Sequence, residues 1–117
     1  VSQIIADGRE TCISRHVSPT ERPSNVRWIF VHPKYPADPE DGMPEVFDDF
    51  YGYSSHLRGP EACILAAARC AQYIEAHVTL NKASQTLMDH AFALSPSEFG
   101  DLARHARAVS RRLEAME

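Results

Sequence analysis

An acidic, aromatic stretch between residues 38 and 53 concentrates side chains that could bind or react. It carries six carboxylates, at Asp38, Glu40, Asp41, Glu45, Asp48 and Asp49. No lysine or arginine occurs from Tyr35 to Leu57, so the rest of the chain must be slightly basic, because the net charge is −4. Apolar side chains lie between the acids, at Met43, Val46, Phe47, Phe50, Tyr51 and Tyr53. Carboxylates that speed encounter and rings that slow dissociation predict a docking surface for a basic protein partner.

We expect seven of these residues to contact that partner: Asp41, Glu45, Phe47, Asp48, Asp49, Phe50 and Tyr51. The alternative is a solvated loop that Phe47 and Phe50 merely pin to the core. A calcium loop does not fit, because Gly42 at its sixth position puts Ala37 at the first, where a carboxylate is required. Adjacent acids in an extended segment point apart, so Asp48 and Asp49 do not predict a catalytic pair.

Four arginines near the end of the chain form a second, cationic candidate site. They are Arg104, Arg107, Arg111 and Arg112. Steps of three and four predict a ridge on one helix face, suited to an anionic ligand or an acidic partner. A helix-hairpin oligomer that binds a nucleotide there, with Tyr73 or Phe92 as contacts, is the alternative function. A solvated face, partly neutralised by Asp101 and Glu114, also explains the pattern.

The histidines and cysteines do not form a recognisable motif. His90, beside Asp89, and His105 could meet across two helices and bind a metal, which gives a weaker alternative of a metal-dependent enzyme. Otherwise no pair with metal-ligand spacing, no nucleophile motif and no phosphate-binding loop occurs. We therefore predict a protein without catalytic residues, metal or cofactor, and not an enzyme.

Composition indicates one folded domain over residues 1–117, with 44% hydrophobic and 24% charged residues. Cys12, Cys63 and Cys70 lack a close pair, which favours a reducing compartment and a cytoplasmic protein. No apolar run reaches the roughly 18–20 residues that span a bilayer, and no signal peptide pattern opens the chain. The acidic balance gives no reason to expect direct contact with nucleic acid.

The first half predicts strands followed by a long loop. Alternation over residues 10–17 and the apolar run at 26–31 are typical of strands, and Asp7-Gly8 suits a hairpin turn with Ile4-Ile5 as its first arm. We expect these segments to form an antiparallel β-meander within residues 1–33. Seven of the eight prolines lie between Pro19 and Pro60, so residues 34–58 are predicted to be the acidic aromatic loop, with at most a helical turn near 44–51.

The second half predicts an antiparallel helical hairpin over residues 60–116. Pro60 and Glu61 suit a helix start, and an apolar stripe continues to Val78, so residues 61–94 form either one helix or two. Ser95 and Glu98 form a capping-box pattern that begins another helix. Its apolar seam comprises Phe99, Leu102, Ala106, Val109, Leu113 and Met116, which packs internally or joins two copies.

The predicted fold class is therefore α+β. The predicted function is that of a small non-enzymatic inhibitor or adaptor that engages a basic protein, such as a nucleic-acid-binding protein, through the acidic loop.

Overall fold

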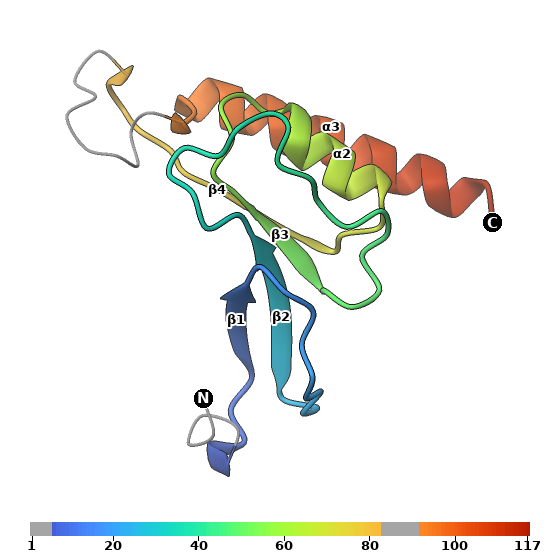
Figure 1. The fold of residues 1–117 in the computed structure, drawn as a ribbon. Helices are drawn as coiled ribbons and strands as arrows, with labels where there is room; N and C mark the ends of the chain where they lie inside the picture. Colours follow the sequence, from blue (N-terminus) through green and yellow to red (C-terminus); the bar gives the residue numbers. More distant parts are fainter. Residues whose placement is uncertain (1–5, 83–91) are drawn as a thin grey trace.

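A four-stranded parallel sheet forms the centre of the fold (Figure 1). The computed structural model describes residues 6–82 and 92–117. The elements are β1 (Thr11–Arg15), β2 (Val26–Val31), β3 (Gly52–Ser55), α2 (Glu61–Ala68), β4 (Tyr73–Ala76) and α3 (Pro96–Ala115). The strands lie in chain order, and every neighbouring pair is parallel. Beyond β4, Val78 forms one further parallel bridge with Leu94.

The prediction of an antiparallel β-meander is wrong, although two of its strands exist. β1 and β2 fall inside the segments predicted from alternation and from the apolar run, but their register pairs Thr11 with Val26 and Arg15 with Phe30, which is parallel. An apolar pattern determines which face of a strand is buried and carries no signal for its direction. The predicted hairpin arm at Ile4-Ile5 lies outside the described residues.

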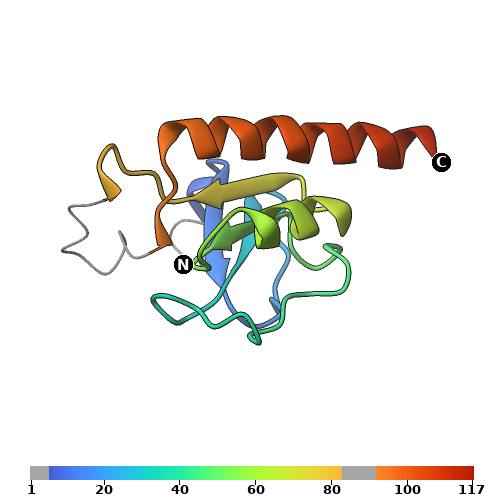
Figure 2. The same ribbon diagram turned by 90° about the horizontal axis from the view of Figure 1, so that it is seen from above.

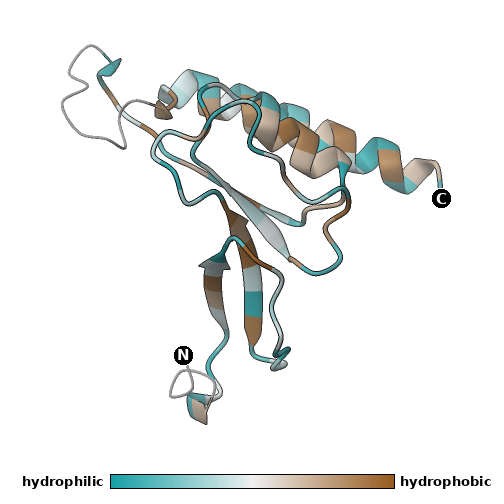
Figure 3. Ribbon diagram, viewed as in Figure 1, coloured by the Kyte–Doolittle hydropathy of each residue, from teal (hydrophilic) through white to brown (hydrophobic). Residues whose placement is uncertain are grey.

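The predicted loop at 34–58 contains the buried strand β3. All four residues of β3 are buried, and it pairs with β2 on one side and β4 on the other. Gly52 makes the close approach to β4 possible, because a Cβ atom there would lie 2.7 Å from the Cβ of Tyr73 and closer still to its carbonyl oxygen. Small side chains hide this strand from a hydrophobicity pattern, and Figure 3 draws it pale beside the brown β2. Residues 44–51 form bends and not the predicted helical turn.

Over residues 61–82, the described part of the predicted helix at 61–94, the structure has a short helix and a strand instead. α2 ends at Ala68, and Cys70 adopts a left-handed conformation with φ of 73°. The Cys70 N–H donates to the Ala67 carbonyl and the Ala71 N–H to the Ala66 carbonyl, which is the Schellman ending of a helix. Glycine usually occupies the left-handed position, so a cysteine there gave no stop signal. The chain then turns back into β4.

α3 begins where the capping box was predicted. Ser95 Oγ accepts the Glu98 N–H, and the Glu98 carboxylate accepts the Ser95 N–H. Of the described part of the seam, Leu102 is buried whereas Met116 is exposed. α2 and α3 run side by side in the same direction on one face of the sheet (Figure 2), so the predicted antiparallel hairpin is wrong. Helices that each follow a parallel strand must share a direction.

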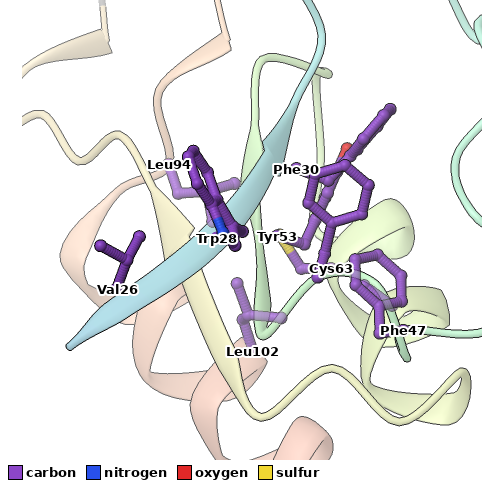
Figure 4. Close-up of a cluster of buried hydrophobic side chains, with 10 residues drawn as sticks. Val26, Trp28, Phe30, Phe47, Tyr53, Cys63, Leu94 and Leu102 are labelled. Atoms are coloured by element: carbon purple, nitrogen blue, oxygen red, sulfur yellow. The ribbon is translucent and has the colours of Figure 1, made fainter. Parts of the chain in front are cut away.

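The core lies between the sheet, the two helices and the loop before β3. Its buried members include Val26, Trp28, Phe30, Phe47, Tyr53, Cys63, Leu94 and Leu102, which Figure 4 labels. Tyr53 and Cys63 are wholly buried between β3 and α2, and burial raises the pKa of Tyr53 to about 12 and that of Cys63 to about 11. Since side chains alternate along a strand, Ser54 and the residues two positions before and after it face away from α2.

Candidate functional site

A histidine directly follows each of the strands β2, β3 and β4. These residues are His32, His56 and His77. Because the three strands are parallel neighbours, their carboxyl ends meet at one edge of the sheet, and that edge is where ligands bind in parallel α/β folds. His32 and His56 are buried and His77 is half-buried. We call His56 and His77 the histidine pair, since their ring centroids are 5.9 Å apart.

Backbone carbonyls fix the tautomer of His56. Its Nδ1 lies 2.7 Å from the carbonyl oxygen of His32 and 3.1 Å from that of Lys34. A carbonyl oxygen can only accept, so Nδ1 carries the proton and donates, which leaves the Nε2 lone pair available. Burial is the main cause that lowers the pKa of His56, with the neighbouring His77 and His32 as smaller causes, while the two backbone hydrogen bonds oppose it. The imidazole is therefore neutral at pH 7.

His32 plays a different part at the same edge. Its Nε2 lies 3.0 Å from the Gly42 carbonyl oxygen, so Nε2–H donates and holds the acidic segment against the end of β2. Its Nδ1 is buried without a hydrogen-bond partner in the structure. His32 thus supports the loop and, through its own carbonyl, the orientation of His56.

A carboxylate, that of Glu75, lies two residues before His77, which by side-chain alternation is the same face of the sheet. Ser54 and Glu75 are paired residues of β3 and β4, and Ser54 Oγ donates to Glu75 Oε1 over 2.8 Å. The Tyr73 hydroxyl donates to Glu75 Oε2 over 3.2 Å. The pKa of Tyr73 is raised by burial first and by Glu75 second, so its hydroxyl keeps its proton as a donor.

This arrangement can transfer protons or hold a metal ion. A neutral imidazole with its second nitrogen anchored on a carbonyl is the form in which histidine acts as a general base or metal ligand. Among residues 6–82 and 92–117, no group of three or more histidine, cysteine or acidic side chains is arranged around a common metal position. The histidine pair would therefore supply two ligands and leave other positions to substrate or water.

The rings of the predicted docking loop lie mostly inside the protein. Phe47 and Phe50 are buried in the core, whereas Tyr51 remains partly exposed beneath the guanidinium of Arg27, 5.3 Å from its ring centroid. Phe50 packs edge-on against Phe30 at 5.4 Å. Neither buried ring is available to a partner without a rearrangement of the loop.

The loop acids divide into paired and exposed groups. Asp49 accepts from Arg22 over 2.6 Å, and Asp41 accepts from Lys34 over 3.2 Å. Asp41 also lines a groove of about 810 Å³ between the loop and α2. Glu45 and Asp48 are exposed. Partner binding through the exposed acids stays a prediction.

The arginine ridge lies on the exposed side of α3. Arg104 pairs with Asp101 at 2.8 Å, and Arg107, Arg111 and Arg112 are exposed. Arg107 and Tyr73 line the same groove of about 830 Å³, but Phe92 lies at the histidine pair instead. Anion binding on this ridge stays a prediction.

Of the predicted metal pair of His90 and His105, only His105 lies among the described residues. His105 is exposed on α3, and His90, like Asp89, lies outside the described residues. Sequence reasoning missed His56 and His77 because they are 21 positions apart in no local motif. The signal was their place directly after a strand, which becomes visible only when β3 and β4 are recognised.

A parallel α/β sheet with histidines and a carboxylate at its carboxyl edge defines an enzyme-like fold and site. The NeuB family model matches residues 33–117, and the chain therefore belongs to the NeuB family. The N-acetylneuraminate-9-phosphate synthases of Mus musculus and Homo sapiens are each 32% identical over 102 residues, which cover 79% of this chain. The chain spans 28% of the length of these relatives.

Two solved structures share the fold. A sialic acid synthetase from Leptospira borgpetersenii, in complex with citrate, aligns over 94% of this chain and 45% of its own with a TM-score of 0.78 and 21% identity. A spore coat polysaccharide biosynthesis protein from Bacillus subtilis aligns over 78% of this chain and 28% of its own, with a TM-score of 0.68 and 29% identity.

These findings correct the prediction of a non-enzymatic inhibitor or adaptor. The family and its named synthases indicate an enzyme. The α+β class is likewise replaced by the α/β fold of the sialic acid synthetase. Within the described ranges, no helix is long and apolar enough to cross a membrane.

Proposed function

We propose that this chain contributes the histidine pair, His56 and His77, to the active site of an enzyme that makes a sialic acid, N-acetylneuraminate or its 9-phosphate. The relatives named as synthases of this product support the proposed reaction class. The observation that carries the site is the position of His56 and His77 after adjacent parallel strands, on the face that also bears Ser54 and Glu75.

The order and direction of the strands support this location for the active site. Parallel strands in chain order with helices on one face are the arrangement of a (β/α) barrel, whose active sites lie at the carboxyl ends of its strands. On this helix-free face, β2 contributes the apolar Ile29 and Val31, and the other paired positions carry polar or small side chains: Cys12, Ser14, Arg27, Gly52, Ser54, Tyr73 and Glu75. We propose that this face lines the interior of a barrel, where polar groups can contact a sugar substrate.

A divalent metal ion fits the histidine pair. Two imidazoles that share one ion at about 2.1 Å per bond hold their centroids roughly 5–6 Å apart, which agrees with the observed 5.9 Å. The carbonyl partner of His56 Nδ1 is the kind of contact that orients metal-ligating histidines. When bound, such an ion supplies Lewis-acid polarisation of a substrate oxygen. His56 and His77 would hold it, while Glu75 and Ser54 contact the polar part of a substrate.

Production of the sialic acid in cells tests the reaction class. The protein is expressed in a bacterial strain whose own sialic acid synthase has been deleted, and N-acetylneuraminate and its 9-phosphate are measured by mass spectrometry. We expect accumulation above cells with the empty vector. Folded protein in the cells without either product would overturn the proposed reaction.

A further inference from the structure

Two aromatic rings cover the histidine pair. Phe92 is 4% exposed and packs against His77 at 4.8 Å and His56 at 5.3 Å between ring centroids. Tyr35 packs on His56 in a tilted arrangement with ring centroids 4.0 Å apart, and its ring centroid lies 6.1 Å from that of Phe92. His56 itself is only 4% exposed as a result.

We propose that Tyr35 and Phe92 form an aromatic cover that controls which ligands reach His56 and His77. The proposal rests on the histidine pair as the binding site under the proposed function. The Nε2 lone pair of His56 is the group a ligand must reach, because Nδ1 is used on backbone carbonyls. Rings packed on both imidazoles occupy space that a ligand at that nitrogen needs.

The two rings have different freedom to move. The segment that carries Phe92 is tied to the sheet, because the Leu94 N–H donates to the His77 carbonyl and the Thr79 N–H donates to the Leu94 carbonyl. Phe92 is therefore a fixed wall. Tyr35 is 46% exposed and belongs to the irregular connection between β2 and β3, so it can swing away from His56. Tyr35 is the movable part of the cover, and Phe92 sets the size of the space beneath it.

Titration with Co²⁺ alone, followed by visible absorption, tests the cover. Loss of an aromatic pair changes affinity roughly 2- to 10-fold, so Tyr35→Ala is expected to bind Co²⁺ tighter than the wild type by that factor. Phe92→Leu removes the ring but leaves a smaller apolar side chain, so it is expected to tighten binding as well. Tyr51→Ala is the matched control, because it removes a similarly exposed tyrosine from the opposite end of β3 and should leave the affinity unchanged.

Unchanged or weaker Co²⁺ binding in both Tyr35→Ala and Phe92→Leu would overturn the cover, and so would a failure of Co²⁺ to bind any of the proteins. The titration does not depend on product formation. If Tyr35→Ala binds Co²⁺ more tightly but the protein makes no sialic acid, the aromatic cover is supported and the proposed synthase function is contradicted. If the protein makes sialic acid but the wild type and both variants bind Co²⁺ with identical affinity, only the proposal of the aromatic cover is contradicted.

Discussion

Replacement of Gly52 by alanine should destabilise the sheet between β3 and β4. The added Cβ would lie 2.7 Å from the Cβ of Tyr73, and the Tyr73 carbonyl is nearer still. Backbone atoms cannot yield as a flexible side chain does, so the two strands must separate. Overpacking of this kind costs about 1–3 kcal/mol. For a chain of this size, the thermal midpoint should fall by about 4 °C for each kcal/mol.

Gly100→Ala provides the matched control. Gly100 lies in the first turns of α3, and a Cβ atom there would meet nothing within 4 Å. Alanine should raise stability by about 0.5–1 kcal/mol, because glycine is the weaker helix former. Thermal unfolding followed by circular dichroism measures both variants. A Gly52→Ala protein as stable as the wild type would refute the described contact of β3 with β4.

Two further predictions concern helix ends. Cys70→Gly should stabilise the fold by about 1 kcal/mol in urea unfolding, since Cys70 has φ of 73° and a left-handed residue with a Cβ is strained; a destabilised variant would contradict the described end of α2. The pKa of Glu98 is lowered to about 2, by Lys82 first and then by the Ser95 cap. A depressed carboxyl pKa adds stability above the ordinary value of 4.5 that is lost as pH falls towards 2. Wild type should therefore lose more thermal stability than Glu98→Gln over this range, and equal losses would argue against the capping box.

The local elements with strong signals were predictable. β1 and β2 followed from alternation and from a β-branched, aromatic run, and α3 followed from Ser95 and Glu98. These signals act within a few residues and need no knowledge of the partner strand. One domain over residues 1–117 remains a prediction.

The direction of the strands and the position of β3 were not predictable in the same way. β3 contains Gly52, Ser54 and Ser55, which lack the bulk of a typical strand, and its burial comes from neighbours on both sides. When β3 is not recognised, the sequence pattern of β1 and β2 favours a local hairpin over a parallel sheet. Because the left-handed residue at the end of α2 is Cys70 and not a glycine, the sequence contains no stop signal there, and the strand residues Tyr73–Ala76 were predicted to be helical.

The candidate site depended on those missed elements. His56 and His77 are distant in sequence and come together only because β3 and β4 are parallel neighbours. The acidic loop attracted the functional prediction because its charge is local and visible. Its phenylalanines instead complete the core beside β2.

Catalytic rates of histidine variants test the central claim most directly. His56→Asn keeps an N–H donor for the carbonyls of His32 and Lys34 but removes Nε2, and His77→Ala removes the second imidazole. Each variant should lose at least roughly 100-fold in the rate of sialic acid formation. His105→Ala, an exposed change on α3, should retain the wild-type rate. Folded His56→Asn and His77→Ala proteins that form the product as fast as His105→Ala would contradict an active site at this edge of the sheet.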